Sequence, residues 1–582
     1  MAEGKIGAFT FVLHSHLPYV LSHGRWPHGT DWLNEACAET YIPILDMIHE
    51  LVDEGISPKL TIGISPVLCE QLGHKSFKNE FCGYLENKIQ AAHTDREVFD
   101  RHGETHMLQL AEMWQNFYTR TKIHFEKNYR NNLPEAFKKL QDDGHIEIMT
   151  CGATHGYMPL LSQDTTVQAQ VKQAVQSYEK FFGCKPRGIW LPECAYRPRY
   201  EWGPPVETDA LGSSPYLRKG VEEFLSENGI EYFVIDSALL KGGKAIGVYI
   251  DRFDALQRLW GQFEKGYKPR KESTERSPHE IYLVSSGDSN KKPVAVFTRD
   301  PDTGLQVWSG EHGYPGDGNY LDFHKKRFPG GHRYWRVTSP KSDLADKKEY
   351  SPEKAAQRIP ENAGHFKSLI KEILTQHYGN SVKPGFLCAP FDCELFGHWW
   401  FEGVNFLKLV VQYVQQDENI ELATCSEYLD QAKPTDVISI PEGSWGQGGY
   451  HYIWLNEWTD WTWKHIYPDE LKMSELARKY GDSDDDKLHN ILKQAARELM
   501  LLCASDWQFL ISTWAARDYA EMRLAEHHAH FKRLANMAET YAEGLEVDTE
   551  DWTFLGDLES QDNIFPDVEP KWFAEVEFPA DS

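Results

Sequence analysis

The chain has 582 residues, of which 41% are hydrophobic and 26% charged, the composition of a globular protein with room for two or three domains. Its formal charge of −27 would repel a phosphate backbone, so nucleic acid is not expected as a partner. No apolar run reaches the roughly 18 to 20 residues of a membrane span, and the N-terminus lacks the pattern of a secretory signal. We expect a cytoplasmic protein with no membrane partner, whose ten scattered cysteines are buried thiols.

Seven short apolar runs without alternation predict parallel strands that are covered on both faces. They lie at 6–13, 59–64, 146–151, 187–191, 231–236, 294–298 and 384–389. Helical patterns fall between most of them, at 34–54, 168–182, 217–228 and 352–378. This alternation predicts an α/β barrel.

Three stretches depart from that alternation. Residues 75–143 are polar and helix-prone, which predicts a helical insertion into a barrel made of 1–74 and 144–428. The segment 253–293 contains a basic, polar loop, and we expect its middle to be mobile. After about residue 430 the strand pattern ends, and strong helical patterns at 484–505 and 511–543 predict a C-terminal helical domain over 429–582. Its acidic tail keeps several aromatic residues, so we expect the tail to wrap around the body.

Titratable and aromatic side chains cluster where five of the predicted strands end. Because barrel active sites lie at the carboxyl ends of the strands, this pattern indicates one shared site. In chain order the strand-end residues include His14, His16, His155, Glu193, Arg299, Trp308, Asp392, Glu394 and His398.

The pair His14 and His16 could hold a metal ion, because residues two apart on a strand share a face. No third ligand is evident near them in the sequence. A role in lining a polar pocket is the favoured interpretation, and a metal site or a purely structural role remains an alternative.

Glu193 follows directly on a buried strand in the sequence WLPECAYRPRY, where an unpaired carboxylate would be costly. The residue is either catalytic or held in a salt bridge with Arg197 or Arg199. Asp392 is the second carboxylate that glycoside chemistry requires. The two arginines would keep Glu193 ionised as a nucleophile, although two buried, salt-bridged acids with no catalytic role would give the same pattern.

Asp392 stands in an aromatic setting, which would raise its pKa by desolvation and suit it to act as the acid and base. The surrounding aromatic residues are Phe391, Phe396, Trp399 and Trp400. Glu394, two residues further on, is an alternative acid.

Five tryptophans crowd into residues 445–463, in a stretch that begins with a glycine-rich loop. Flat rings of this kind stack on the CH faces of sugars, but we expect at least three of the five to form a domain interface. Trp445, in the glycine-rich loop, is the favoured ligand contact, and Asp506 at a predicted helix start is a similar candidate.

With these residues assembled, the chain resembles glycoside hydrolase family 57, most closely its 1,4-α-glucan branching enzymes. The resemblance covers nearly all of the chain and rests on long motifs in matching order. They are HSHLPY (14–19), THGYMPLL (154–161), WLPECAYRP (190–198), RDPDTGLQVWSGEHGYPGDGNY (299–320), APFDCELFGHWW (389–400), the Trp-rich loop and SDWQFLIST (505–513).

The resemblance implies a distorted (β/α)7 barrel, with a helical insertion and a C-terminal helical domain, that carries out a retaining double displacement without metal or cofactor. Matched by motif, Glu193 corresponds to the nucleophile and Asp392 to the proton donor. Four further positions, Arg299, Gly316, Trp445 and Asp506, would contact substrate, while His14, His16, His155, Trp308 and His398 would line the pocket. The implied substrate is an α-1,4-glucan, as donor and acceptor, and the implied assembly is a monomer or small homo-oligomer.

Three other functions remain open from the sequence. A functional tyrosine that the resemblance places in a flexible loop cannot be aligned within 253–293, so an amylase-like hydrolase or a 4-α-glucanotransferase of the same family is the first alternative. A catalytically silent glucan-binding protein and a metal-dependent, deacetylase-like hydrolase acting through His14 and His16 are the others.

Overall fold

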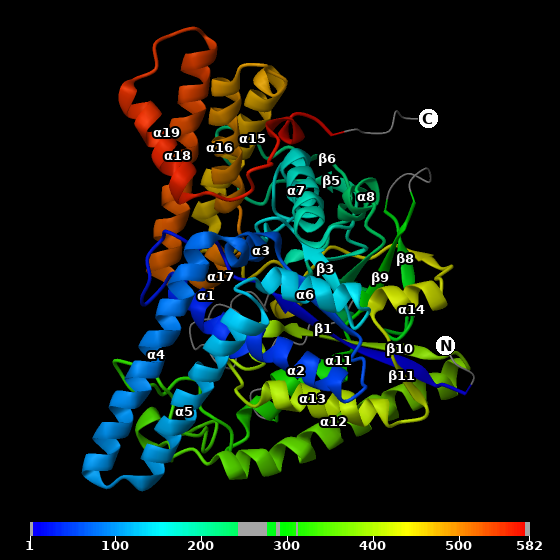
Figure 1. Cartoon of the computed structure of the whole chain (residues 1–582). Helices are drawn as coiled ribbons and strands as arrows, with labels where there is room; N and C mark the ends of the chain where they lie inside the picture. Colours follow the sequence, from blue (N-terminus) through cyan, green and yellow to red (C-terminus); the bar gives the residue numbers. More distant parts are fainter. Residues whose placement is uncertain (1–3, 242–275, 287–291, 310–311, 577–582) are drawn as a thin grey trace.

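Seven parallel strands form the centre of the molecule, in the order β10-β1-β2-β3-β4-β7-β9 (Figure 1). The computed structural model describes residues 4–241, 276–286, 292–309 and 312–576. The strands are β1 (Gly7–Ser15), β2 (Leu60–Ile64), β3 (Ile146–Cys151), β4 (Gly188–Trp190), β7 (Tyr232–Ile235), β9 (Val294–Thr298) and β10 (Gly385–Asp392). The prediction of seven strands is confirmed.

The ring of strands closes through a single parallel bridge between Arg299, just after β9, and Cys388 in β10. The backbone N–H of the next residue, Asp300, donates to the Cys388 carbonyl at 3.0 Å. Elsewhere neighbouring strands share regular ladders, such as the eight-residue register of β1 with β10. The contact between β9 and β10 is therefore the shortest in the parallel ring, which agrees with the expectation of a distorted barrel.

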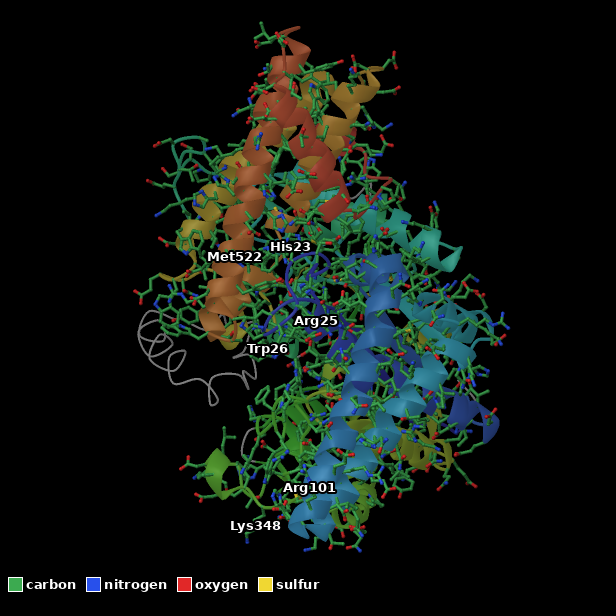
Figure 2. The ribbon with its side chains drawn as sticks, turned by 60° about the vertical axis from the view of Figure 1, so that its left-hand side comes forward. His23, Arg25, Trp26, Arg101, Lys348 and Met522 are labelled. Carbon is green, nitrogen blue, oxygen red and sulfur yellow. The ribbon has the colours of Figure 1, made fainter. Side chains whose placement is uncertain are left out.

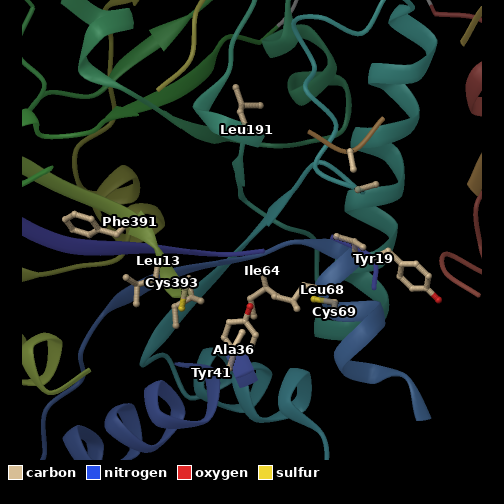
Figure 3. Close-up of a cluster of buried hydrophobic side chains, with 14 of the residues drawn as sticks. Leu13, Tyr19, Ala36, Tyr41, Ile64, Leu68, Cys69, Leu191, Phe391 and Cys393 are labelled. Atoms are coloured by element: carbon tan, nitrogen blue, oxygen red, sulfur yellow. The ribbon is translucent and has the colours of Figure 1, made fainter. Parts of the chain in front are cut away.

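The strands are buried because helices cover the outside of the ring. Every residue of β1 is buried, and Leu13 of β1 lies beside Phe391 of β10 in the register. Figure 3 shows these two side chains in one apolar cluster with Tyr41, which comes from the helical segment after β1. Apolar side chains on both faces of the strands therefore fix the barrel, and the polar residues are left at the strand ends.

The barrel helices follow the predicted pattern, with one error. The predicted helix at 217–228 begins as a strand, because Tyr216–Arg218 (β6) pairs antiparallel with Tyr200–Trp202 (β5) and the helix starts only at Val221. The helices are α1 (Thr30–Ala36), a π-helix (Cys37–Tyr41), α2 (Ile42–Asp53), α3 (Pro66–Gly73), α7 (Asp164–Phe182), α8 (Val221–Glu227), α9 (Ser237–Lys241), α11 (Pro301–Trp308), α12 (Pro352–Ser381), α13 (Gly403–Gln415) and α14 (Cys425–Gln431).

Between β2 and β3 the chain is helical, as the sequence predicts for 75–143. The elements are α4 (Lys75–His102), α5 (Thr105–Ile123), a π-helix (His124–Asn128) and α6 (Leu133–Asp142). The pair α4 and α5 extends away from the barrel at the lower left of Figure 1. Its buried residues, such as Trp114, contact the segment around Arg333, whose carbonyl accepts a hydrogen bond from the Trp114 indole at 2.6 Å.

Three further short strands were not predicted, and one of them lies beyond residue 430, where the sequence indicated that strands end. This strand, Val437–Ile438 (β12), pairs with Tyr282–Val284 (β8), which is antiparallel to β9, and Ile420–Leu422 (β11) pairs with β1. These strands are two or three residues long, too short to leave a period in the sequence. Most of the predicted mobile segment 253–293 lies outside the described residues, and β8 belongs to the part that is described.

The C-terminal part consists of helices and a buried tail. The predicted helix at 511–543 is in fact two, because Trp514 has a left-handed backbone (φ 59°) that ends α17. Tail residues Phe565 and Phe573 are fully buried, and Gln168 donates to the Trp572 carbonyl at 2.7 Å, so the expectation that the tail wraps the body is confirmed. The helices are α15 (Asp460–Tyr480), α16 (Asp486–Leu502), α17 (Asp506–Thr513), α18 (Arg517–Ala542) and α19 (Thr549–Gln561).

None of the helices in the described ranges combines the length and apolar character needed to cross a membrane.

Candidate active site

A cleft of about 530 Å³ opens at the carboxyl ends of the barrel strands. The predicted site residues that line it come from five strand ends and from the C-terminal part of the chain. They are His14, His16, His155, Glu193, Arg299, Trp308, Asp392, His398, Trp445 and Asp506, together with the alternative acid Glu394. The structure therefore brings together ten of the eleven predicted residues.

Asp392 ends β10, and the strand register places it beside His14 of β1. Burial raises the pKa of the Asp392 carboxyl to about 6, and the nearby charges of Arg299 and His16 oppose that rise. The expected direction of the shift is confirmed, but its aromatic neighbours are only partly those expected. Phe391, the preceding residue, points into the core, where its ring lies 5.7 Å from that of Phe396.

Glu193 follows β4 in a left-handed backbone conformation (φ 61°, ψ 27°), which is uncommon for a residue with a Cβ. Its carboxylate accepts hydrogen bonds from the Trp445 indole at 2.8 Å and from the Ser505 hydroxyl at 3.2 Å. The pKa of Glu193 is raised to about 8, chiefly by burial and also by the negative charges of Asp392 and Asp506, although the two hydrogen-bond donors oppose the rise.

The prediction that Arg197 and Arg199 keep Glu193 ionised is wrong. The Arg197 guanidinium is fully buried and lies 3.5 Å from Asp164, and Arg199 pairs with Glu223 at 3.1 Å. The cause is the turn after Glu193, where the chain leaves the strand end and carries both arginines away from the cleft.

A chain of hydrogen bonds runs from His14 through His155 and Ser505 to Glu193. Since Ser505 donates to Glu193, its oxygen accepts from His155 Nδ1 at 2.8 Å, which leaves His155 Nε2 to accept from His14 Nε2 at 3.0 Å. Burial lowers the pKa of both imidazoles, so both are neutral, as this arrangement requires. The two histidines thereby fix the direction of the Ser505 hydroxyl, and so the orientation of the Glu193 carboxylate.

Two groups that include cleft residues have donor atoms close enough to hold a metal ion: His14 with the buried Cys151 and His155, and His16 with His155 and Asp506. Both groups include His155, whose two ring nitrogens already take part in the chain of hydrogen bonds to Glu193. An ion at either position would break that chain, so the donor atoms fit an organising role for these histidines better than a ligand role. A third group, outside the cleft, comprises Glu498, His527, His530 and Asp562.

Further polar groups surround the two carboxylates. Asp506, at the start of α17, accepts from His16 Nε2 at 3.0 Å, and Arg299 lies 3.5 Å from Asp236 with its guanidinium over the Trp445 ring. His398 contacts Glu39 at 2.9 Å on another wall. The cleft therefore combines aromatic faces with charged hydrogen-bonding groups.

The alternative acid, Glu394, already accepts two hydrogen bonds. The Tyr41 hydroxyl and the His16 backbone N–H both donate to Oε1, the latter at 3.1 Å. Burial raises the pKa of Glu394 to about 8. Among the described residues no side chain donates to the Asp392 carboxyl, which leaves Asp392 better placed than Glu394 to bond to a ligand.

The structure does not bring Gly316 to the cleft. It ends a short 3₁₀-helix whose first residue, Tyr314, is buried against the Trp400 and Phe406 rings and bonded to His365 at 2.6 Å. Packing of Tyr314 into the core fixes the position of this turn, and Gly316 is not among the residues that line the cleft.

Of the five clustered tryptophans, Trp445 and Trp454 line the cleft, and Trp454 and Trp463 are fully buried. The indole N–H of Trp454 has no hydrogen-bond partner among the described residues. Trp507, the neighbour of Asp506 in the chain, is a core residue whose indole donates to the Leu501 carbonyl at 2.8 Å.

Several cleft residues were missed by the sequence reasoning. One group lies at 26–35 and includes Trp26, His28, Trp32 and Glu35, and the others include Phe323, Lys326, Phe509, Leu510 and Ala515. The aromatic and proline residues that follow the first strand were the available signal for 26–35. Ser505 lay within a recognised motif, but only the fold shows that it contacts Glu193.

The arrangement suits transfer of a glycosyl group. Two carboxyl groups in one cleft can supply a nucleophile and a proton donor. The pKa is raised to about 8 for Glu193 and to about 6 for Asp392, so near neutral pH the pair holds one proton, mostly on Glu193 and not on Asp392 as the sequence predicted. The minor form with its proton on Asp392 is the one that fits the roles of nucleophile and proton donor.

Sequence comparison places this fold and site in a known class. The model of glycosyl hydrolase family 57 matches residues 10–441, and a second model, "1,4-alpha-glucan branching enzyme, C-terminal", matches 465–573. The chain belongs to glycosyl hydrolase family 57.

Three individual relatives within this family are similar to nearly the whole chain. The 1,4-alpha-glucan branching enzyme TK1436 of Thermococcus kodakarensis is 40% identical over 97% of this chain and 78% of the relative. The crystal structure of a GH57-type branching enzyme from Pyrococcus horikoshii has a TM-score of 0.87 and 39% identity, covering 99% of this chain and 98% of that one. The alpha-amylase AmyC of Thermotoga maritima has a TM-score of 0.78 and 29% identity, with 98% and 100% covered.

Proposed function

We propose that this protein is a 1,4-α-glucan branching enzyme. The observation that carries the proposal is the meeting of Glu193 and Asp392 in one cleft, in a chain whose C-terminal part also matches the branching-enzyme model. The substrate is an α-1,4-glucan, which serves as both donor and acceptor.

In the first step, the Glu193 carboxylate attacks the anomeric carbon and Asp392 protonates the departing 4-hydroxyl oxygen. The C1–O4 bond breaks as the C1–Oε bond forms. Trp445 and Ser505 hold Glu193 for the attack, because each donates to a different oxygen of its carboxylate. The Arg299 charge near Asp392 favours the ionised carboxylate that this step leaves behind.

In the second step, the Asp392 carboxylate takes the proton of an acceptor 6-hydroxyl, whose oxygen displaces Glu193 from the anomeric carbon. Two inversions give net retention and create an α-1,6 branch. Trp308, His398, Asp506 and the Trp445 ring provide stacking and hydrogen-bonding surfaces for the glucan within the cleft.

The proposal includes a setting for the enzyme. We place it in the cytoplasm, in the synthesis of a glycogen-like glucan, as a monomer or small homo-oligomer that needs no metal or cofactor. All ten cysteines are free and eight of them are buried, which supports a reducing compartment.

An amylase-like hydrolase or a 4-α-glucanotransferase is the second candidate, and the likeness to the alpha-amylase AmyC supports the first of these. Branching, hydrolysis and 4-α-glucan transfer share the same covalent glycosyl-enzyme intermediate. They differ only in the acceptor that attacks it, which is a 6-hydroxyl, water or a 4-hydroxyl, respectively.

Proton NMR of the products from amylose distinguishes these reactions. Branching produces α-1,6 anomeric signals with few new reducing ends. Reducing ends that increase in step with bond cleavage would identify a hydrolase, and longer linear chains without α-1,6 signals would identify a 4-α-glucanotransferase. Loss of activity after dialysis against a chelator would favour metal-dependent chemistry at His14 and His16. Activity that survives the Glu193→Gln substitution would favour a role for Glu193 in binding alone.

A further inference from the structure

Trp514 combines a strained backbone with an exposed side chain. It ends α17 in the left-handed conformation (φ 59°, ψ 17°), a position that normally favours glycine because a Cβ is poorly accommodated there. Its side chain is 55% exposed, so burial of the indole does not offset this strain. Strain without a packing benefit points to a role in binding.

The indole of Trp514 is held in place by its neighbours. The Trp458 ring meets it edge to face, with 5.7 Å between ring centroids. The Arg517 guanidinium lies 5.2 Å from the Trp514 ring centroid and is itself bonded to Glu521 at 2.7 Å. The ring is therefore oriented before any ligand arrives, which lowers the entropy lost on binding.

Trp514 lies at the outer end of a helix whose inner end is in the cleft. Asp506 starts α17 and bonds to His16, while Leu510 and Ala515 line the cleft wall. Eight helical residues span about 12 Å. The exposed indole therefore lies at the rim of the cleft, beside Ala515, and one α17 length away from Asp506, so a glucan chain of several units could contact both.

The beginning of α18, which follows Trp514, adjoins the part of the cleft formed by residues 26–36. The Tyr519 ring meets that of Trp32, a cleft residue, edge to face at 5.5 Å. Figure 2 brings this side of the molecule forward and shows Met522 of α18 and Trp26 on it. Met522 is 46% exposed and Trp26 is 68% exposed, so two further large apolar side chains are accessible on this side of the molecule.

We propose that Trp514, supported by Trp458, is a stacking subsite for an α-glucan chain outside the catalytic cleft. This inference rests on the proposed function for the nature of the ligand. A neutral sugar presents CH groups to an indole face and hydroxyls to a neighbouring guanidinium. A second copy of the chain fits less well, because each copy carries a charge of −27 and a stable interface usually buries more than about 1,000 Å², far more than two rings offer.

Val382 provides a matched control for a Trp514→Gly variant. It also caps a helix in the left-handed conformation (φ 55°) and is 75% exposed, but it lies at the end of α12 and does not line the cleft. Glycine relieves the same backbone strain at both positions, so both variants should unfold at a temperature equal to or above that of the parent.

Binding is measured in a Glu193→Gln background, which prevents turnover, by affinity electrophoresis through gels containing amylose. Trp514→Gly is expected to weaken binding roughly 3- to 10-fold, the scale of one aromatic contact. Val382→Gly should bind like the parent, and Trp514→Phe, which keeps an aromatic face, should retain most of the affinity.

Unchanged amylose binding by Trp514→Gly would overturn the subsite. If Trp514→Gly changed only the oligomeric state, measured by sedimentation, Trp514 would be a contact between copies of the chain and the subsite would also be overturned. Linkage analysis of the products made by the parent enzyme is a separate readout. If α-1,6 linkages form while Trp514→Gly binds normally, the subsite fails and the proposed function stands; if binding falls and no α-1,6 linkages form, the branching proposal fails.

Discussion

Trp445 donates two hydrogen bonds to Glu193, one from the indole to the carboxylate at 2.8 Å and one from the backbone N–H to the Glu193 carbonyl at 3.1 Å. The loop that carries Trp445 is also tied to the strand end three residues later, where Tyr196 and Gly443 exchange backbone hydrogen bonds at 2.8 and 3.0 Å. One loop thus fixes both the backbone and the side chain of the proposed nucleophile.

Trp445→Phe should therefore impair chemistry without displacing the loop. Phenylalanine keeps an aromatic ring for the contacts with Trp190 and Arg299, but it cannot donate to Glu193. A hydrogen bond to a charged group contributes about 1.5 to 3 kcal/mol, so kcat/KM on amylose should fall about 10- to 100-fold. Steady-state kinetics measures the loss, and a variant with wild-type kcat/KM would show that the indole N–H is dispensable.

A plot of kcat/KM against pH should be bell-shaped. The two carboxyl groups influence each other, so the values of about 6 and about 8 belong to the pair. Below the lower value both groups are protonated and no nucleophile exists; above the upper value no proton remains for the leaving group. We expect kcat/KM to rise through pH 6 and fall through pH 8.

The Ser505→Ala substitution tests whether the fall of kcat/KM above pH 8, the alkaline limb of the profile, is due to Glu193. Loss of the hydroxyl donor raises the pKa of Glu193 further, so the alkaline limb should move to higher pH. The maximum should fall, because a smaller fraction of the singly protonated enzyme carries its proton on Asp392. An alkaline limb that stays in place would contradict the assignment of that limb to Glu193.

The sequence predicts the barrel well because its strands are covered on both faces. Continuous apolar runs such as 146–151 are visible without knowledge of the partners. Parallel strands also bring their ends to one edge, so polar residues at 14–16, 193 and 392 could be placed in one site before the structure was known. The short strands β8, β11 and β12 could not be predicted, because two or three residues carry no periodicity.

Side-chain partners were the part that the sequence could not supply. Arg197 and Arg199 are close to Glu193 in the chain, yet the turn after residue 193 sends them to Asp164 and Glu223. The residues that do donate to the Glu193 carboxylate, Trp445 and Ser505, are far away in the chain, and Ser505 is separated from Glu193 by 312 residues. The helix break at Trp514 could not be predicted from the sequence either, because no glycine or proline is present at that position.

Asp164 is expected to be a major contributor to stability. Its Oδ1 lies 2.6 Å from Arg218 Nε and 3.5 Å from Arg197, and both arginines are almost fully buried. Asp164→Asn would leave two buried cations without their shared anion, which should lower the free energy of unfolding by about 3 to 5 kcal/mol. Urea denaturation measures the change.

Glu86→Gln serves as the control for Asp164→Asn. Glu86 pairs with Lys122 at 2.6 Å but is 63% exposed, so its loss should leave the denaturation midpoint nearly unchanged. Equal midpoints for Asp164→Asn and the wild type would show that the two arginines find other partners.

The roles of the two carboxylates, Glu193 and Asp392, can be distinguished with a substrate whose leaving group needs no proton. An α-maltosyl fluoride needs no proton to release fluoride, so it bypasses the acid role of Asp392 but not the nucleophile. Asp392→Asn should lose about 10²- to 10⁴-fold activity on amylose, the usual contribution of general acid catalysis. The same variant should release fluoride at a rate much closer to that of the wild type.

Glu193→Gln should be inactive on both substrates, because no glycosyl-enzyme can form. A fluoride electrode follows the first half-reaction directly. If Asp392→Asn and Glu193→Gln lost fluoride release equally, Asp392 could not be the acid, and Glu394, two residues further along the same cleft wall, would take its place.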